Sequence, residues 1–409
     1  MSEPLTIVLA GINGYGRRYL NAILNPPAHA NIKLIATVDP FGEKYDRLGE
    51  LRKKGVLHFN SLQEFYQSHT ADLLVIASPI QLHAEQICLA LQHGSNVLCE
   101  KPLCCSTEDA ARIANMQRRF NRHVTVAFQW SFSGAMQELK ADILAGRFGA
   151  PKRLRCMALW PRDQVYYQRN DWAGKIRDSI GRAVFDSPVN NACAHCLHNL
   201  LHVIGPTVYT SANPLRVEAE LFRANPIENY DTAVLRCYTD AGVPLLFVTS
   251  HATRNLLGPM FYFEFENAVL HYHEAPHAVI KVTFETGSSL CYGCPTEPDE
   301  NKLWRTIETI RSNKPSWSSI EAATSHTHAV AMAQQSPRGI ISFPKRLIRR
   351  IGQTPHETIV VQGLDSALKR CYEAFALPSE LGIAWATKPA LQSKVRLTST
   401  QSANREIVV

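Results

Sequence analysis

No apolar run in this sequence of 409 residues approaches the roughly 20 residues that a transmembrane helix needs. The N-terminus also lacks the basic segment, apolar core and small-residue cleavage site of a secretory signal peptide. Internal repeats and low-complexity linkers are missing as well. We therefore expect a folded cytoplasmic protein that does not act at a membrane.

A strong charge of either sign is also missing. Charged residues make up 19% of the chain and the formal net charge is +7, which is small for this length and predicts no nucleic-acid partner. One basic cluster, Lys345-Arg346 with Arg349-Arg350, has helical spacing. We interpret this cluster as the solvated face of a helix.

Cysteines are plentiful but odd in number, so a closed set of disulfides cannot use all eleven. Most lie inside apolar stretches, which fits a reducing compartment. Two Cys-x-x-Cys pairs, Cys193/Cys196 and Cys291/Cys294, have the spacing of zinc ligands or of a redox pair. We favour the alternative that these thiols pack in the protein interior, and we predict no metal.

Short apolar strands alternate with helical patterns from the N-terminus to about residue 128. This alternation predicts an α/β fold with a doubly wound parallel sheet. The expected strands are 5–10, 32–38, 73–77, 97–99 and 124–128, and the expected helices are 17–24, 83–92 and 107–120.

Beyond residue 128, long strands follow one another with short connections, which predicts a mostly antiparallel sheet with fewer helices. We therefore expect two domains, residues 1–127 and 128–409. The expected strands of the second domain are 153–160, 215–223, 231–239, 243–250, 259–266, 268–273 and 279–285, and its helices lie near 135–145, 192–204, 301–311 and 361–374.

The loop Gly11-Ile12-Asn13-Gly14-Tyr15-Gly16 lies between the first strand and the first helix. A helix N-terminus at this place can hold a pyrophosphate through its free N–H groups. Asn13 stands where the usual G-x-G-x-x-G pattern has its second glycine, but asparagine tolerates a left-handed backbone. A purely structural turn is the alternative for such a loop taken alone.

Asp39 ends the second strand, 23 residues after Gly16. A carboxylate at this place can accept hydrogen bonds from both ribose hydroxyls of NAD, and it repels the 2′-phosphate of NADP. No arginine follows it directly, so we predict NAD rather than NADP. Lys44 lies close enough in the sequence to leave NADP open as the alternative.

Glu100-Lys101-Pro102-Leu103 follows the apolar strand 97–99, so Lys101 stands at the carboxyl end of a strand. Together with the glycine loop, Asp39, Ser78-Pro79 and His83, this motif resembles the Gfo/Idh/MocA oxidoreductase family. The resemblance is strong over the first 130 residues. It implies an N-terminal Rossmann domain that binds NAD(P), and a C-terminal α/β domain whose open, mostly antiparallel sheet carries substrate and oligomer contacts.

The resemblance also implies a role for Lys101. Its ammonium would lie beside the nicotinamide, hydrogen-bond the reacting oxygen and exchange a proton, since burial lowers the pKa of a lysine. Glu100 would orient this segment. The cofactor site implied by the resemblance consists of Gly11, Asn13, Gly14, Tyr15, Gly16, Asp39, Ser78, Pro79, His83, Glu100, Lys101 and Gln129.

A second catalytic segment of the family, Asp-x-x-x-His, is altered in this chain. His195 matches the family histidine, but Asn191 stands where the carboxylate is usual. Asn191 can bind a sugar hydroxyl and cannot accept a proton, so we expect His195, which ordinarily titrates near neutral pH, to assist Lys101. His198 and His202 have a spacing compatible with zinc, and we interpret these histidines as residues that line a cleft.

The stretch 161–189 is a long polar loop rich in aromatic and cationic residues. Aromatic faces stack on sugar rings, while amides and cations bind hydroxyl or carboxylate groups. An ordinary loop packed by its own aromatics is the alternative. We predict that the substrate contacts Tyr167, Arg169, Asn170, Lys175, Asn191, His195 and His198.

We therefore expect an NAD-dependent dehydrogenase or reductase of a sugar, sugar acid or cyclitol, assembled as a homodimer or homotetramer through the C-terminal sheet. Two alternatives remain at this point. One is a glycosidase that uses bound NAD for transient oxidation, and the other is a non-catalytic NAD-binding regulator of the same fold.

Overall fold

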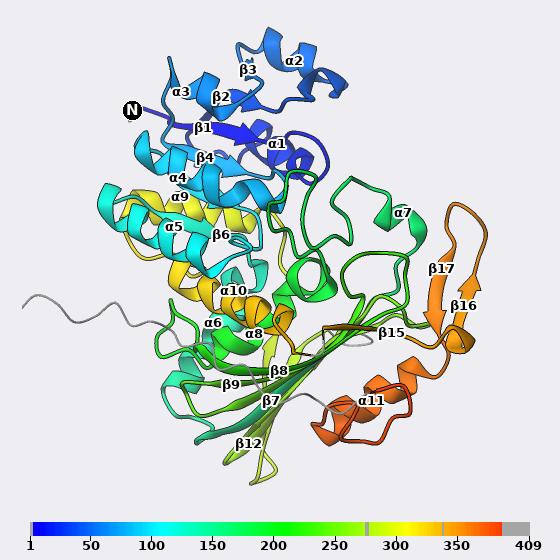
Figure 1. Ribbon diagram of the computed structural model, residues 1–409. Helices are drawn as coiled ribbons and strands as arrows, with labels where there is room; N and C mark the ends of the chain where they lie inside the picture. The colour runs from blue at the N-terminus through cyan, green and yellow to red at the C-terminus, as the bar shows by residue number, and fades with distance from the viewer. Residues whose placement is uncertain (1–2, 275–277, 338, 387–409) are drawn as a thin grey trace, which may run out of the picture.

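Two β-sheets organise the chain (Figure 1). A computed structural model describes residues 3–274, 278–337 and 339–386. The first sheet forms one lobe, and the larger second sheet forms the other. Within the described residues, no helix is both long and apolar enough to cross a membrane.

The first sheet has six strands in the order β3-β2-β1-β4-β5-β6, and every pair is parallel. This is the strand order of a Rossmann fold, in which the order reverses between β1 and β4 and leaves a crevice at their carboxyl ends. The strands are β1 (Leu5–Ala10), β2 (Ile32–Val38), β3 (Leu57–Phe59), β4 (Leu73–Ile76), β5 (Asn96–Cys99) and β6 (Val124–Val126).

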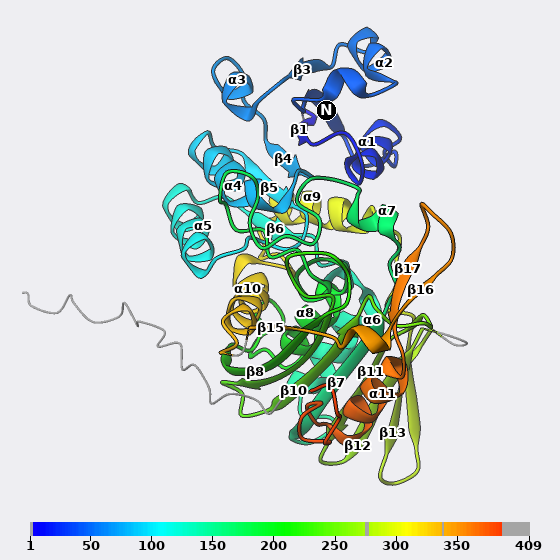
Figure 2. The same cartoon turned by 45° about the vertical axis from the view of Figure 1, so that its right-hand side comes forward.

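Helices cover both faces of this sheet, because its strands are apolar on both sides. One face packs against α1 (Gly16–Leu24), α2 (Leu48–Lys53) and α9 (Asn301–Ser312). The other packs against α3 (Leu62–Tyr66), α4 (His83–Gln92), α5 (Thr107–Phe120) and α10 (Ile320–Gln334). Thus α9 and α10 return from the second half of the chain to the first lobe, as Figures 1 and 2 show.

The second sheet has nine strands in the order β14-β13-β12-β11-β7-β10-β9-β8-β15. Only the pairs β7–β10 and β8–β15 are parallel among them. The strands are β7 (Pro151–Leu159), β8 (Pro214–Arg223), β9 (Thr232–Thr239), β10 (Pro244–Ser250), β11 (Leu257–Phe265), β12 (Ala268–His273), β13 (Ile280–Phe284), β14 (Ser289–Gly293) and β15 (Ile340–Ser342).

The two faces of the second sheet are covered differently. Helices α6 (Gly134–Leu144), α8 (Ala194–Val203) and α10 pack on the face that looks toward the first lobe. Helix α11 (Leu364–Ala374) and the residues up to Ala386 pack on the opposite face, over β7 to β10. Beside α11 stands a hairpin of β16 (Ile348–Ile351) and β17 (Thr358–Val361).

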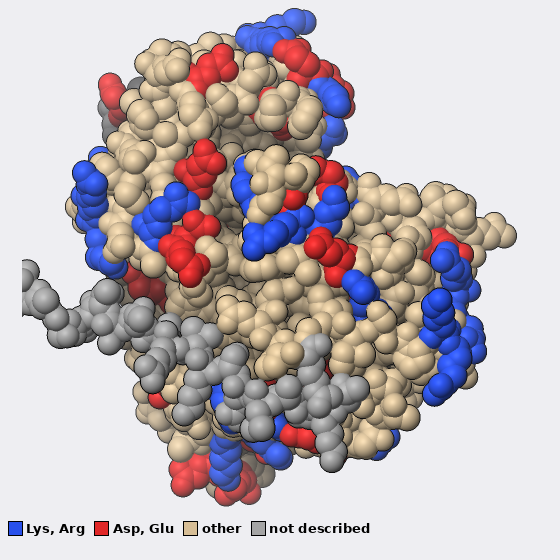
Figure 3. Space-filling model, in the orientation of Figure 1, with Lys and Arg blue, Asp and Glu red and all other residues tan. Residues whose placement is uncertain are grey.

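The predicted fold class is confirmed: a parallel Rossmann sheet precedes a mixed, mostly antiparallel sheet. The division at residue 127 stays a prediction. The basic cluster is exposed, at the edge of the face seen in Figure 3, but the predicted helix is wrong. Lys345 and Arg346 lie in η5 (Lys345–Leu347), a single 3₁₀ turn, and Arg349 and Arg350 lie on β16, whose backbone pairs with β17.

Candidate active site

A cavity of about 1140 Å³ lies between the first lobe and the long loop of the second. Its floor is formed by the residues that follow β1, β2, β4 and β5, which is the switch point of the first sheet. Most of the predicted site residues line it, namely Gly11, Asn13, Gly14, Tyr15, Asp39, Ser78, Pro79, His83, Glu100, Lys101, Gln129, Arg169, Asn170, Asn191 and His195.

The glycine loop has the backbone that its sequence predicts. Gly11 has φ +83°, and a Cβ on it would lie 2.8 Å from the backbone of Ala77. A Cβ on Gly16 would lie 1.8 Å from the carbonyl oxygen of Gly11, so Gly16 allows α1 to pack on the loop without lining the cavity itself. Gly14 has φ +56° and open space where a Cβ would stand. Because Gly14 has no side chain, a ligand can approach the backbone of the loop closely.

Asp39 is buried, with 7% of its surface exposed, and its carboxylate is held in place by the glycine loop. Its Oδ2 accepts hydrogen bonds from the backbone N–H of Ile12 at 3.1 Å and from the Asn13 amide at 3.2 Å. Its Oδ1 accepts one from the N–H of Phe41 at 2.9 Å. Asn13 thus has a role that glycine could not have, since it fixes this acidic group.

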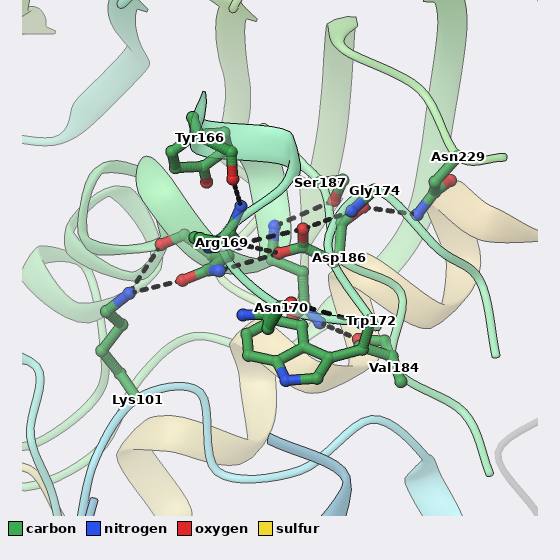
Figure 4. Close-up of polar contacts among 12 residues, drawn as sticks. Lys101, Tyr166, Arg169, Asn170, Trp172, Gly174, Val184, Asp186, Ser187 and Asn229 are labelled. Atoms are coloured by element: carbon green, nitrogen blue, oxygen red, sulfur yellow. Dashed lines mark hydrogen bonds and ion pairs between the residues drawn. The ribbon is translucent and has the colours of Figure 1, made fainter. Parts of the chain in front are cut away.

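Lys101 points across the cavity at the second lobe (Figure 4). Its Nζ donates to the backbone carbonyl of Asn191 at 2.8 Å and to the Asn191 Oδ1 at 3.0 Å. Burial lowers the pKa of Lys101; Glu100 opposes this shift and Lys302 adds to it. The amine is therefore closer to releasing a proton at neutral pH than an exposed lysine is.

Glu100 forms a buried ion pair with Lys302 of α9, at 2.7 Å. Lys302 also donates to the Tyr15 hydroxyl at 2.7 Å, and Tyr19 donates to the same Glu100 oxygen at 2.7 Å. Burial acts to raise the pKa of Glu100, but the charges of Lys302 and Lys101 and the hydrogen bonds from Lys302 and Tyr19 together outweigh burial, so the pKa is lowered. Sequence reasoning missed Lys302, because its partner lies 202 residues away.

His195 lies on the first turn of α8 and lines the cavity. Burial lowers its pKa well below the ordinary value, and the charges of Lys101 and Lys302 lower it further. The expectation that His195 titrates near neutral pH is therefore wrong, because burial and two neighbouring lysines disfavour the charged ring. Its Nδ1 is buried without a hydrogen-bond partner among the described residues, so the neutral ring has bonding capacity to spare.

His83 and Gln129 are two further residues of the predicted cofactor site. The His83 ring lies 2.8 Å from the carbonyl oxygen of Pro102 and 3.1 Å from that of Ser78, so it braces the ends of β4 and β5 together. Gln129 begins η3 (Gln129–Phe132), the turn that follows β6. Both residues line the cavity, as predicted for the cofactor site.

The loop between β7 and α8 brings only part of the predicted substrate set to the cavity. Arg169 and Asn170 line it, whereas Tyr167, Lys175 and His198 do not. The Arg169 guanidinium lies 3.9 Å from the centre of the Tyr166 ring. It also pairs with Asp186 at 3.1 Å. Trp172 lines the cavity as well, and the sequence reasoning had not selected it.

The Tyr167 hydroxyl is buried without a hydrogen-bond partner among the described residues. His198 is buried against Phe128, with ring centres 3.8 Å apart, and its Nε2 lies 2.9 Å from the Ser131 hydroxyl. The substrate roles predicted for Tyr167, Lys175 and His198 stay predictions. Tyr167 and Lys175 belong to the loop and His198 to α8, and spacing alone does not define which of their side chains line the cavity.

The possible metal ligands lie apart. Within the part of the chain that the structure describes, no three His, Cys, Asp or Glu side chains come together as metal ligands. Cys193 and Cys196 are buried in and beside α8, whereas Cys291 and Cys294 are exposed at β14.

Fold and cavity together define a protein with a Rossmann sheet joined to a second lobe, whose residues line one side of the cavity. Residues 5–128 match the model of the oxidoreductase family with an NAD-binding Rossmann fold. Over this region the chain is similar to the Gfo/Idh/MocA oxidoreductase family.

Two curated relatives are similar over the same region. Inositol 2-dehydrogenase of Corynebacterium glutamicum is 26% identical over 156 residues, which are 38% of this chain and 45% of the relative. The NADP(+)-type scyllo-inositol 2-dehydrogenase of Bacillus subtilis is 29% identical over 141 residues, 34% of this chain and 41% of the relative. The chain thus spans less than half the length of these relatives.

Solved structures resemble both lobes. The WlbA dehydrogenase of Bordetella pertussis, in complex with NADH and UDP-GlcNAcA, has a TM-score of 0.65 at 19% identity and covers 81% of this chain and 97% of its own. UDP-N-acetylglucosamine 3-dehydrogenase of Acidithiobacillus ferrooxidans has a TM-score of 0.63 at 18% identity and covers 82% of this chain and 98% of its own. At this level of identity the likeness concerns the fold.

Proposed function

We propose that this chain is an NAD-dependent oxidoreductase that transfers a hydride between the nicotinamide and a carbinol or carbonyl carbon of a sugar, sugar acid or cyclitol. The observation that carries the proposal is the position of Lys101. Its amine stands in the cavity that the glycine loop opens, held by Asn191 of the second lobe. It is therefore placed to meet an oxygen of a substrate that enters between the lobes.

The residues present fit an NAD molecule. Gly11 and Gly14 provide the left-handed turns and the close approach that a pyrophosphate needs at the start of α1. Asp39 provides a carboxylate for the ribose hydroxyls at the far end of the cavity. Lys44 also lines this end, but its ammonium lies over the Phe41 ring, 5.0 Å from the centre. NAD is the cofactor that this arrangement favours.

The bound nicotinamide supplies the hydride acceptor or donor. Lys101 hydrogen-bonds the reacting oxygen, stabilises negative charge on it and gives or takes its proton. Burial lowers the pKa of this lysine, which suits proton exchange near neutral pH. The neutral His195 ring and the Asn191 amide orient neighbouring hydroxyls, because each has both donor and acceptor capacity.

The substrate class follows from the groups that surround Lys101. Trp172 offers an aromatic face, and Asn170, Asn191 and Gln129 offer amides, in the same cavity. Stacking faces beside amides suit a ring that carries several hydroxyl groups. Relatives named as inositol and nucleotide-sugar dehydrogenases support this choice.

The test is a panel of inositols, sugars, sugar acids and nucleotide sugars, each incubated with NAD⁺ or NADP⁺ while NADH or NADPH fluorescence is followed. We expect net NADH formation with at least one cyclitol or sugar, and none with Lys101→Met, which should still bind NADH. Cleavage of a glycoside without net NADH would instead establish the glycosidase alternative. NADH binding without turnover of any compound would favour the regulator.

We further propose a cytoplasmic homodimer or homotetramer. Eleven free thiols, nine of them buried, suit a reducing compartment. Since the cluster around α11 covers the outer face of β7 to β10 and also contacts Met260 and Tyr262 of β11, we propose the contact on the outer face of β12 to β14, around the adjacent His271 and Lys281. Light scattering after size-exclusion chromatography should give two or four chains per particle, and His271→Glu should lower that number.

A further inference from the structure

Asp186 is a buried carboxylate that the reaction outlined above does not use. Only 2% of its side chain is exposed. It accepts hydrogen bonds from the Gly174 N–H at 2.6 Å and from the Asn191 amide at 2.7 Å (Figure 4). We propose, on the basis of the proposed function, that Asp186 is a positioning residue that orients Asn191 and through it Lys101. Asp186 lies behind Asn191 as seen from Lys101, and it supplies the negative charge that a carboxylate at position 191 would supply directly.

The chemistry of these groups leaves the Asn191 amide one orientation. A carboxylate only accepts hydrogen bonds and an ammonium only donates them. The amide nitrogen must therefore face Asp186, at 2.7 Å, and Oδ1 must face Lys101, at 3.0 Å. Rotating the Asn191 amide by half a turn would place its Oδ1 against the Asp186 carboxylate, which are both acceptors. It would also place the amide nitrogen against the Lys101 ammonium, which are both donors. Asp186 thus decides which atom Lys101 meets.

Asp186 also acts on Lys101 through its charge. Glu100, Lys302, Asp186 and Cys193 are the titratable groups that act most strongly on this amine, and His195 interacts with its charge as well. Burial lowers the pKa of Lys101 and Lys302 lowers it further, whereas the two carboxylates raise it. Asn191 passes on no proton, because an amide does not titrate, so the influence of Asp186 is orientation and charge.

The same carboxylate connects Lys101 to the substrate loop. Arg169 pairs with Asp186 at 3.1 Å and lines the cavity. Asp186 therefore helps to position both Arg169 and Lys101, and a substrate could contact these two cations at the same time. Asp178, in the same loop, pairs with Arg182, and its side chain is 4% exposed, but no contact joins it to Asn191. Asp178 is therefore the matched control, a carboxylate that pairs with an arginine of the loop without contacting Asn191.

The experiment measures the Lys101 pKa in the full chain without any substrate. Lysine amines are labelled competitively with acetic anhydride over a range of pH, and the Lys101 peptide is quantified by mass spectrometry. Asp186→Asn should lower the Lys101 pKa by about one unit, and Asn191→Asp should raise it by a similar amount. The double variant, with the carboxylate moved next to Lys101, should have a pKa at or above that of the wild type. Asp178→Asn should leave the value unchanged.

An unchanged Lys101 pKa in Asp186→Asn would overturn the proposal. If that variant does not fold, Asn191→Asp and the double variant decide, since a lower Lys101 pKa in the double variant would support the action of Asp186 on Lys101 and an equal value would contradict it. These readouts use no substrate, so they are independent of the panel that tests the proposed function. With a substrate from the panel, Asp186→Asn should lower kcat by about tenfold or more, and the double variant should restore kcat. A double variant as slow as Asp186→Asn would also overturn the proposal.

Discussion

Replacing Lys302 with methionine should destabilise the chain strongly at neutral pH. The Lys302 ammonium lies 2.7 Å from Glu100 Oε1, and the two side chains are 3% and 12% exposed. Removing one partner of such a pair leaves an uncompensated buried charge, which costs about 3–5 kcal/mol. We therefore expect the free energy of unfolding to fall by about that amount at neutral pH.

The pH dependence of this loss follows from the direction of the Glu100 shift. Its pKa is lowered in the folded chain, because the effects of Lys302, Lys101 and Tyr19 together outweigh the effect of burial. The stabilisation is therefore present above about pH 4.3, the ordinary value for glutamate. It is lost as the pH falls through the lower, folded pKa. The wild type and Lys302→Met should thus differ most near neutral pH and converge in acid.

The assay is urea unfolding followed by tryptophan fluorescence, for which Trp304 on α9 is a local reporter. Lys302→Met, Glu100→Gln and the double variant form a thermodynamic cycle. We expect a coupling energy of about 2–3 kcal/mol, since the double variant leaves no buried charge unpaired. Lys314→Met, an exposed lysine just beyond the same helix, is the control. A Lys302→Met protein within about 0.5 kcal/mol of the wild type, or additive single effects, would refute the reasoning.

Three further predictions concern other residues. Gly11→Ala should abolish NADH binding in a fluorescence titration, because its Cβ would lie 2.8 Å from the backbone of Ala77 at a φ of +83°. Gly14→Ala, with open space at its Cβ, should weaken binding less. Asp39→Ala should weaken NADH binding by about tenfold or more and reduce the preference over NADPH, as measured by the two dissociation constants. Burial lowers the pKa of Lys140 to about 7. The unfolded chain therefore holds one more proton above that pH, and the stability of the wild type relative to Lys140→Met should rise by about 1.4 kcal/mol per pH unit between pH 8 and 10.

The first lobe could be predicted closely because its signals are local. Each strand is a short apolar run, each helix has its own period, and the glycine loop, Asp39 and Lys101 follow directly after strands. In a parallel sheet the carboxyl ends of the strands meet at one edge. Residues that are far apart in the sequence are thereby brought to one cavity without any knowledge of side-chain contacts.

Helix α10 and the short elements between β2 and β4 were missed for different reasons. Helix α10 is buried on most sides, so it lacks the polar face that marks an amphipathic helix. Helices α2 and α3 have six and five residues, too few for a period to appear. The basic cluster was wrongly predicted as a helix, since its spacing fits a helix whereas the backbone of Arg349 and Arg350 pairs as a strand.

The part of the site that the sequence did not predict depends on contacts between distant segments. Lys302 acts through Glu100, and Asp186 acts through Asn191; neither residue belongs to a motif. The low pKa of His195 arises from burial and from two lysines that only the fold brings near. Sequence spacing gives the residue types at a site, whereas their charge states depend on neighbours that come from elsewhere in the chain.

The most direct test of the central claim, that a hydride passes between substrate and nicotinamide with the help of Lys101, uses isotopic labelling. A cyclitol or sugar that the panel identifies is prepared with deuterium on the reacting carbon and incubated with NAD⁺ and the full chain, and the reduced cofactor is analysed by mass spectrometry. We expect one deuterium per NADH with the wild type, and no labelled NADH with Lys101→Met, although that variant binds NADH. Unlabelled NADH from the wild type, or labelled NADH formed equally fast by Lys101→Met, would contradict the account.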